Sequence, residues 1–418
     1  MQLRQKIANI YHLIISALWT IINGYPSGKL FVIGVTGTDG KTTTCHLIYE
    51  IFKASGIKVG LISSIGAFAK NKKIDTGLHV TTPDAKLMQP LLRRFVDMGT
   101  THMILEVTSH GLDQNRLFGC NFSIGVITNV SHEHLDYHGT FEEYRKAKMK
   151  LLRNVKWAIL NADDESFDYF KEKIGKGIKL IGYRKARVKN VSKSLKGEYN
   201  LYNIKAAMSV CKILELPRDK VNMVVQNFRG VEGRREDIDT EKGFRVVIDF
   251  AHTPNGLRNI LLQLKNELQN GKRLIAIFGS AGDRYIEKRP MMGEISAKLA
   301  DISIFTAEDP RSENVNQIIE QIAAGALKAG TKELFLDKKH VTYNDISSIR
   351  GHLFTRIPKR GEAISFAIQK LAKRGDIVVI CGKGHEKSMA YGKVEYPWSD
   401  HEAVRFALEG KVLRIQRK

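Results

Sequence analysis

Short apolar runs alternate with longer segments of helical spacing along most of the chain. Segments 46–52, 86–98, 141–152 and 200–214 repeat apolar residues every three or four positions, which predicts helices. Apolar runs rich in Val, Ile and Leu predict strands at 32–36, 58–63, 102–107, 124–130 and 157–161. Strands that alternate with helices predict a parallel sheet with helices on both faces. The polar segments 70–84 and 184–196 are expected to form loops.

A change of composition at residues 230–236 predicts a domain boundary. Apolar runs then recur at 245–250, 274–279, 302–306 and 377–381, with helices expected between them. We therefore predict an α/β fold with a central parallel-sheet domain over 29–234 and a Rossmann-like α/β domain over 235–418. An apolar helix over 1–28 is expected to precede them.

The N-terminal apolar run, residues 11–22, follows the basic residues Arg4 and Lys6. It is shorter than the roughly 20 apolar residues that span a bilayer. It also lacks the small-residue cleavage site of a signal peptide. Two interpretations stay open: a helix packed on the first domain, or an interfacial helix lying on a membrane.

The chain is strongly basic, with a formal net charge of +22. Such a charge suits nucleic acid, a membrane surface or a polyanionic substrate, although solvated basic faces are the simpler explanation. No basic run is interleaved with aromatic residues, so we expect no nucleic-acid partner. Four cysteines, at 45, 120, 211 and 381, form no C-x-x-C pair, which argues against a zinc site and favours the reducing cytoplasm.

The segment Gly37-Thr38-Asp39-Gly40-Lys41-Thr42-Thr43 follows the first predicted strand and precedes a helix. A strand, a glycine-rich turn and a helix N-terminus form a common cradle for a polyphosphate. Lys41 can reach the β- and γ-phosphates, and Thr42 can ligate Mg²⁺. The strict pattern G-x-x-x-x-G-K-[ST] would need glycine in place of Val35, so the motif is a shortened phosphate-binding loop. An ordinary glycine-rich turn is the alternative.

Acidic and histidine residues follow two other predicted strands of the first domain. Glu106 closes an apolar strand and can complete the shell of the Mg²⁺, although it could instead cap the next helix. Segment 131–139 is dense in histidine and acid but lacks the spacing of a structural zinc site. Because ligands bind at the carboxyl ends of parallel strands, both segments are candidates for the site.

Three polar motifs follow strands of the second domain, at 279–284, 308–313 and 382–386. Arg pairs bidentately with a carboxylate, and Glu pairs with an amine. Converging Arg and Glu side chains from these motifs would suit a zwitterion, although any one motif could be a surface turn.

The ordered series of motifs resembles the Mur ligase family, and within it the ligases that add the third residue of the peptidoglycan stem. The resemblance runs from about Phe31 to the C-terminus. It includes Thr81-Thr82, Glu106 to Leu112, His134 to Gly139, Asn200 to Asn203, Gly233-Arg234, Asp249 to Pro254, Asp309 to Glu313 and Gly384 to Glu386. It implies an ATP-dependent ligase that activates an acceptor carboxylate as an acyl phosphate, which the amine of an amino acid then attacks.

The resemblance also implies roles for individual residues. Lys41, His134 and Lys148 would be catalytic; Thr42, Glu106, His134 and Lys148 would hold Mg²⁺, with Lys148 as N6-carboxylysine. The expected ATP contacts are Gly37, Thr38, Asp39, Gly40, Lys41, Thr42, Thr43, Asn203, Arg234 and Asp249. The muramoyl-peptide acceptor would contact Thr81, Thr82, Thr108, Gln114 and Arg116, and the amino acid would contact Arg284, Asp309, Arg311, Gly382 and Glu386.

Two departures from the family pattern are visible. Only about thirty residues precede the first strand, too few for the domain that usually grips the uridine diphosphate of the acceptor. Asp309 stands where ligases for meso-diaminopimelate have asparagine, in Asn-Pro-Arg. Arg311 suits a second carboxylate, which lysine lacks, so meso-diaminopimelate is preferred over L-lysine.

Two other functions stay open at this point. A folylpolyglutamate-type ligase would explain the fold and the phosphate-binding loop, but not the motifs at 309–311 and 384–386. A non-catalytic nucleotide-binding partner of cell-wall enzymes would not need Lys41, Glu106 and Lys148 together. We expect a cytoplasmic monomer, with the N-terminal helix as a candidate peripheral contact with the inner face of the membrane.

Overall fold

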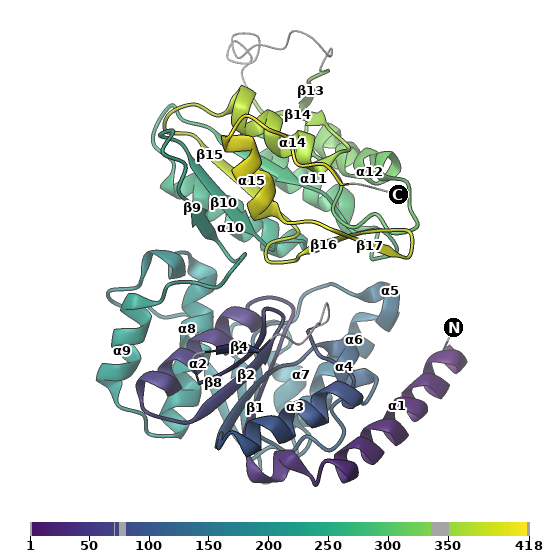
Figure 1. Ribbon diagram of the computed structural model, residues 1–418, viewed down its shortest axis with the longest axis vertical. Coiled ribbons are helices and arrows are strands. Elements are labelled where there is room, and N and C mark those ends of the chain that lie inside the picture. Colours follow the sequence, from purple (N-terminus) through teal and green to yellow (C-terminus); the bar gives the residue numbers. More distant parts are fainter. Residues whose placement is uncertain (1, 71, 75–80, 336–350, 416–418) are drawn as a thin grey trace. The chain divides into compact units, whose positions relative to one another are not determined.

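The chain forms two compact units, which divide between Arg229 and Gly230. The computed structural model describes residues 2–70, 72–74, 81–335 and 351–415. The elements of both units are labelled in Figure 1. Arg234, the predicted last residue of the first domain, lies in the second unit.

The first unit is built on a mostly parallel sheet. Over the described residues this sheet has eight strands, in the order β4-β3-β2-β5-β1-β6-β7-β8. In this order, the neighbours β2-β5-β1-β6-β7-β8 pair in parallel. At the other edge, β3 pairs antiparallel with both β2 and β4. The strand bounds are β1 (Phe31–Thr36), β2 (Val59–Ser63), β3 (Gly66–Ala69), β4 (Lys72–Ile74), β5 (His102–Glu106), β6 (Phe122–Ile127), β7 (Trp157–Asn161) and β8 (Lys179–Tyr183).

Helices cover both faces of this sheet. Met88, Leu92 and Phe95 of one helix share a core with Val32 and Leu105 of the sheet. Residue 106 points to the opposite face from residue 105, and there it meets the helix that follows β1. The helices are α2 (Lys41–Ala54), α3 (Ala85–Asp97), α4 (Ser109–Asp113), α5 (Leu135–His138), α6 (Phe141–Met149), α7 (Phe167–Lys173), α8 (Glu198–Ile213) and α9 (Arg218–Asn227), with short 3₁₀ turns η1 (Pro26–Lys29), η2 (Lys150–Leu152) and η3 (Lys193–Leu195).

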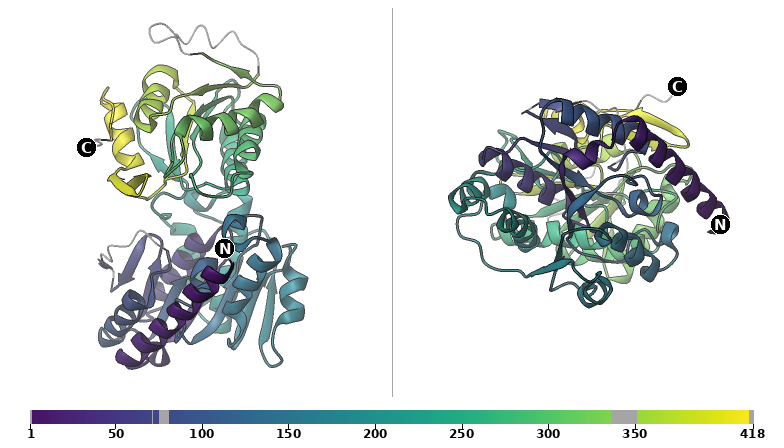
Figure 2. Two further views of the ribbon diagram at one scale, coloured as in Figure 1. Left: turned by 90° about the vertical axis from the view of Figure 1, so that its right-hand side faces the viewer. Right: turned by 90° about the horizontal axis from the view of Figure 1, so that it is seen from below.

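The expected N-terminal helix is α1 (Gln2–Ile22), which packs against α3 and lies along the outside of the first unit (Figure 2). Tyr25 follows in a left-handed conformation, with φ of 51°, and turns the chain toward β1. Among the described residues, no helix has both the length and the apolar character needed to cross a bilayer.

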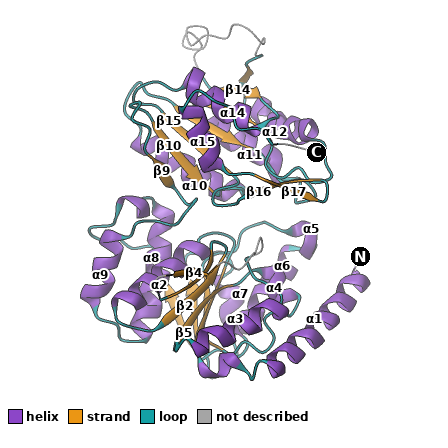
Figure 3. Ribbon diagram, in the orientation of Figure 1, coloured by secondary structure: helices purple, strands orange, loops and turns teal. Residues whose placement is uncertain are grey.

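The second unit repeats the α/β plan, with strands inside and helices outside (Figure 3). Its described residues form a seven-stranded sheet in the order β13-β14-β12-β11-β15-β10-β9, parallel except for the edge strand β9. The strands are β9 (Glu236–Ile238), β10 (Arg245–Asp249), β11 (Leu274–Phe278), β12 (Ile302–Phe305), β13 (Lys332–Glu333), β14 (Leu353–Arg356) and β15 (Ile377–Cys381), and a separate hairpin joins β16 (Ser388–Tyr391) to β17 (Val394–Pro397). The helices are α10 (Pro254–Glu267), α11 (Lys288–Leu299), α12 (Val315–Lys328), α14 (Arg360–Phe366), η4 (Ala367–Leu371) and α15 (Asp400–Leu408).

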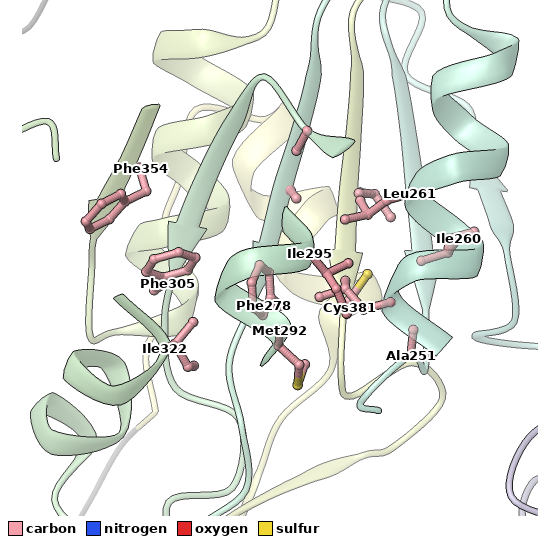
Figure 4. Close-up of a cluster of buried hydrophobic side chains, with 14 of the residues drawn as sticks. Ala251, Ile260, Leu261, Phe278, Met292, Ile295, Phe305, Ile322, Phe354 and Cys381 are labelled. Atoms are coloured by element: carbon pink, nitrogen blue, oxygen red, sulfur yellow. The ribbon is translucent and has the colours of Figure 1, made fainter. Parts of the chain in front are cut away.

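An aliphatic and aromatic core joins the second sheet to α10, α11 and α12 (Figure 4). Phe278, Phe305 and Phe354 come from three neighbouring strands and are fully buried. Leu261 of α10 and Ile322 of α12 pack into the same cluster. Strands buried on both faces explain why their sequences are continuous apolar runs rather than alternating ones.

The predicted α/β fold class is confirmed, and so are the strands expected from long apolar runs. The helix predicted over 141–152 ends as an α-helix at Met149 and continues as a 3₁₀ turn. The loop expected over 70–84 was wrong in part, because Lys72–Ile74 form β4, and residues 71 and 75–80 lie outside the described residues. The basic segment 184–196 is irregular except for η3, as expected.

Candidate active site

The phosphate-binding loop, residues 37–40, connects β1 to α2 and is fixed by the end of β6. The Asp39 amide donates to Asn129 Oδ1 at 2.9 Å, and Thr128 Oγ1 donates to the Asp39 carbonyl at 2.6 Å. Gly37 lies so close to this strand end that a Cβ would be 1.8 Å from Thr128 Oγ1. Because α2 begins at Lys41, the free amides of its first turn face this loop.

Lys41 and Asn203 both lie against the loop. Lys41 Nζ donates to the carbonyls of Gly37 and Thr38, at 3.1 and 2.9 Å. Gly40 has φ of 79°, and a Cβ there would lie 2.2 Å from Oδ1 of Asn203 on α8. The structure thus gathers the first-unit residues predicted to contact ATP: Gly37, Thr38, Asp39, Gly40, Lys41, Thr42, Thr43 and Asn203.

Thr42, in the first turn of α2 after the loop, forms a buried pair with Glu106. Thr42 Oγ1 donates to Glu106 Oε1 at 2.9 Å, and both residues are at most 3% exposed. The other carboxylate oxygen accepts from the backbone amide of Ser64 at 2.9 Å and from its hydroxyl at 3.2 Å. Three oxygen-bearing side chains from α2, β5 and the end of β2 therefore converge, as a hard divalent cation requires.

Lys148 is buried on α6, with 1% of its surface exposed. Its Nζ lies over the ring of Tyr144, 4.4 Å from the centroid. Burial, with the charge of Lys41 nearby, lowers the pKa of the Lys148 amine well below its usual range. Tyr144 in turn contacts Thr38 of the loop, with 3.1 Å between the two hydroxyl oxygens. Lys148 is thereby placed next to the phosphate-binding loop, in surroundings that disfavour its charged form.

His134 lies in a cluster of aromatic and histidine rings near Lys148. It adopts a left-handed conformation, with φ of 58°, before α5. Its ring centroid is 4.8 Å from that of His110 and 6.2 Å from that of Tyr144. Burial lowers the pKa of His138, in the same cluster, to about 4, so that imidazole is neutral at physiological pH. Over the described ranges, no group of three or more His, Cys, Asp or Glu side chains is arranged to bind a metal.

The residues predicted to contact the acceptor meet at the end of β5. Thr82 Oγ1 accepts from the Thr108 amide at 2.9 Å and lies 3.1 Å from its hydroxyl. Arg116 donates to the Thr82 carbonyl at 3.0 Å and to Gln114 Oε1 at 2.7 Å. Thr81 is the half-buried neighbour of Thr82. Burial lowers the pKa of Arg116, whose guanidinium is the cation of this group.

Arg234 and Asp249, the other predicted ATP contacts, belong to the second unit. The Asp249 carboxylate accepts from the Arg235 amide at 2.6 Å and from the Ala251 amide at 2.7 Å. The Arg234 guanidinium stacks over the Phe250 ring, 4.2 Å from its centroid. These two side chains are therefore held in place at the end of β10.

The predicted amino-acid site lies at the ends of β12 and β15. Asp309 Oδ1 accepts from Lys383 Nζ at 2.8 Å, and Lys383 also pairs with Glu386. Arg311, with φ of 49°, donates to the Gly282 carbonyl at 2.7 Å. Gly382 approaches Glu308 so closely that a Cβ would lie 2.7 Å from its Oε2. Arg284 is exposed on the segment after β11.

The electrostatics of this second site depend on two buried residues, Lys383 and Glu308, which were not among its predicted contacts. Lys383 is 1% exposed. Burial opposes its charge, but Glu386 and Asp309 raise its pKa above the usual value. Burial raises the pKa of Glu308 to about 7. Both lie inside the predicted polar motifs, at 308–313 and 382–386, so their sequence positions alone could have pointed to them. Ser64, by contrast, lies in a different part of the chain from Glu106 and carries no such signal.

Comparisons with known proteins agree with this organisation. The Mur ligase middle domain matches residues 35–192, and the Mur ligase, glutamate ligase domain matches residues 233–384. A UDP-N-acetylmuramoyl-L-alanyl-D-glutamate–2,6-diaminopimelate ligase from Bacillus licheniformis is 32% identical over 417 residues, covering 92% of this chain and 80% of that protein.

Solved structures resemble this chain at two levels of sequence identity. A structure of a UDP-N-acetylmuramoyl-L-alanyl-D-glutamate–2,6-diaminopimelate ligase is 30% identical, with a TM-score of 0.56, and covers 91% of this chain and 78% of that one. A bifunctional folylpolyglutamate synthase/dihydrofolate synthase from Yersinia pestis has a TM-score of 0.67 and 18% identity, covering 90% of this chain and 91% of that one. At that identity the second likeness shows the fold alone.

Proposed function

The chain belongs to the Mur ligase family of ATP-dependent ligases, and on that premise we propose that it adds meso-diaminopimelate to a UDP-N-acetylmuramoyl-L-alanyl-D-glutamate type of acceptor in peptidoglycan synthesis. In this reaction the acceptor carboxylate attacks the γ-phosphorus of ATP and ADP leaves. The amine of the amino acid then attacks the acyl phosphate, phosphate leaves, and an amide bond remains. The names of the similar ligases support the choice of both substrates.

The buried Thr42–Glu106 pair is the observation that carries the catalytic part of this proposal. The Thr42 hydroxyl, at the start of the helix after the phosphate-binding loop, lies 2.9 Å from the Glu106 carboxylate of β5. Mg²⁺ in nucleotide sites takes a hydroxyl and a carboxylate of this kind as its protein ligands. We propose that Thr42 and Glu106 hold Mg²⁺, which neutralises phosphate charge when it is bound. Lys41 adds its ammonium charge to the same loop, and the first-turn amides of α2 face the phosphates.

The environment of Lys148 supports its carboxylation. A neutral amine can attack CO₂, forming an N–C bond and releasing one proton, whereas an ammonium cannot. Burial favours the neutral amine, and Lys41 nearby would stabilise the carbamate anion that results. We propose that the carbamate of Lys148 and the imidazole of His134 would bind a second Mg²⁺.

A direct test of the carbamate is ¹³C NMR of the whole protein in buffer with ¹³C-bicarbonate. A carbamate signal is expected from the wild type, and it should be absent from Lys148→Ala. Lys146→Ala is the matched control, because Lys146 lies on the same helix and is exposed. A spectrum that is identical in the wild type and Lys148→Ala would refute carboxylation at this residue.

The second unit supports a zwitterionic amino acid with an extra carboxylate. Arg311 and Arg284 can each pair with a carboxylate, and Glu386 with an ammonium group. Lys383 neutralises part of the negative charge of Asp309, so the departure from asparagine at this position does not leave an uncompensated acid. These contacts favour meso-diaminopimelate over L-lysine.

The experiment that tests the proposed function is ADP release with the soluble muramoyl dipeptide and either amino acid. Faster turnover is expected with meso-diaminopimelate, and Arg311→Ala should reduce that preference. Arg405→Ala, at an exposed arginine of α15, is the control and should leave the preference unchanged. Absence of ADP release with every muramoyl peptide and amino acid would refute the ligase proposal. An unchanged preference in Arg311→Ala would refute the assignment of specificity alone.

We propose that the enzyme acts in the cytoplasm as a monomer, with peripheral contact to the inner face of the membrane. Its four cysteines are free, and three of them are buried, which suits a reducing compartment. Sedimentation of the purified chain checks the monomeric state.

A further inference from the structure

The helix α1 turns polar side chains toward the first unit. Asn9 Nδ2 donates to Asp113 Oδ2 at 3.1 Å, and Ser16 Oγ donates to the Asn115 carbonyl at 2.9 Å. One turn further on, Thr20 Oγ1 lies 3.3 Å from the Phe118 carbonyl oxygen. Hydrogen bonds along the helix therefore fix α1 to the segment that follows α4.

Seven large apolar side chains of α1 face away from the protein. Their exposed fractions range from 49% for Leu18 to 62% for Ile22. Their spacing of three or four residues places them on one face of the helix. This apolar stripe consists of Ile7, Ile10, Tyr11, Ile14, Leu18, Ile21 and Ile22. A continuous apolar face of this length is rare on monomeric proteins that touch only water, and it marks an interaction surface.

The charge around the apolar stripe identifies what can cover it. Residues 1–38 contain no Asp or Glu, and the whole chain carries a formal net charge of +22. Lys29 is exposed just after the helix. On α3, which packs against α1, Lys86 and Arg94 are exposed, while the exposed Asp97 is paired with Arg93. A second copy of the chain would bring an equally large positive charge, which opposes pairing. An anionic lipid surface attracts the same charge.

We propose that α1 docks on a bilayer surface containing anionic lipids, with its axis in the plane of the membrane and its apolar stripe in the outer part of the acyl region. An amphipathic helix with basic surroundings binds membranes in this way. Trp19 and Tyr11 on the helix are residue types that favour the headgroup level. This inference depends on the packing of α1 and not on the ligase reaction, so the two can fail separately.

Flotation of the full chain with lipid vesicles tests the proposal. Vesicles of phosphatidylcholine alone are compared with vesicles that also contain phosphatidylglycerol. The wild type is expected to float with the anionic vesicles. Ile14→Glu/Leu18→Glu should bind them at least about tenfold more weakly, because two charged groups would replace the apolar side chains that enter the bilayer.

The matched control is Leu262→Glu/Met291→Glu, which adds the same two charges at exposed apolar positions of the second unit. This variant should float like the wild type to within about twofold. An equal loss in both variants would overturn the proposal, because net charge alone would then explain binding. Absence of wild-type flotation would overturn it as well, and so would sedimentation that shows a dimer dissociated by the α1 variant.

Fluorescence gives a second readout on the folded protein. Brominated acyl chains in the anionic vesicles should quench Trp19, and Trp19→Phe should lose this quenching while it keeps flotation. Quenching that is unchanged in Trp19→Phe would place α1 away from the bilayer and overturn the proposed docking face.

Discussion

The buried ion pair between Arg360 and Asp400 tests how the candidate amino-acid site is supported. Neither side chain has exposed surface. The guanidinium donates to both carboxylate oxygens, each at 2.7 Å, which is the bidentate geometry of strong Arg–carboxylate pairs. Trp398 Nε1 donates to the same carboxylate at 2.9 Å. The pair is thus closed to water on all the sides that the structure describes.

Arg360 also connects the two strand ends that carry the site. It donates to the Ala307 carbonyl at 3.2 Å and to the Cys381 carbonyl at 2.9 Å. Ala307 immediately precedes Glu308, and Cys381 immediately precedes Gly382. Arg360 therefore connects the ends of β12 and β15, the two neighbours of β11, at the point where their polar loops begin.

Replacing Asp400 with alanine would leave the Arg360 charge buried without its carboxylate. Breaking a buried pair in this way costs about 3–5 kcal/mol. With a urea dependence of about 1–3 kcal/mol per molar, the unfolding midpoint of the second unit should fall by about 1–5 M. The assay is urea titration followed by circular dichroism and by tryptophan fluorescence, because Trp398 reports on this unit and the two units need not unfold together.

Two further variants separate the buried charge from other effects. Glu362→Ala removes an exposed pair with Lys359, at 3.2 Å, and should cost no more than about 0.5 kcal/mol. Arg360→Met/Asp400→Leu removes both charges and should recover most of the loss, because the buried guanidinium charge is then gone. A loss below about 1 kcal/mol in Asp400→Ala, or a double variant no better than the single one, would refute this account.

Three more outcomes follow from the structure. Thr42→Val should lower the rate of ADP release about 100-fold or more, whereas Thr42→Ser keeps the hydroxyl and should stay within about tenfold of the wild type. Gly40→Ala should lower the free energy of unfolding more than Gly56→Ala, since both have φ near 80° but only Gly40 faces Asn203; equal losses in urea titrations would contradict the clash. Burial raises the pKa of Glu308 from 4.5 to about 7, so the folded state binds this proton more tightly than the unfolded state does. The free energy of unfolding should therefore fall by roughly 3 kcal/mol as the pH rises from about 4.5 to 7. Glu308→Gln should abolish that slope in urea titrations at several pH values.

Local chemistry explains which parts of the fold the sequence could predict. Strands such as β5 and β15 are buried on both faces, so each reads as a continuous apolar run. The strand β8 is at the edge of its sheet and partly exposed, and β14 has only four residues, so neither shows such a run. The hairpin β16–β17 pairs residues on one short segment and likewise shows no apolar run.

The same distinction applies to the candidate site. The phosphate-binding loop was predictable because its glycines, lysine and threonine are neighbours in sequence. The contact of Glu106 with Ser64 depends on β2 and β5 pairing in the sheet, and no local pattern encodes that pairing. Asn129 supports the loop in the same way, from the end of β6. The site residues themselves stay predictions, which the variants of Thr42 and Arg311 address.

The orientation of α1 shows where periodicity stops being informative. A helical stripe of apolar residues predicts an amphipathic helix, and the usual expectation is that the stripe faces the core. Here the neighbouring segment presents polar groups, among them the Asn115 carbonyl and the Asp113 carboxylate, so the polar side of the helix is the one that fits. Each such hydrogen bond contributes only about 0.5–1.5 kcal/mol net. Because the apolar stripe consists of other, exposed residues of α1, it can enter a lipid surface without breaking these hydrogen bonds, and membrane binding does not compete with them.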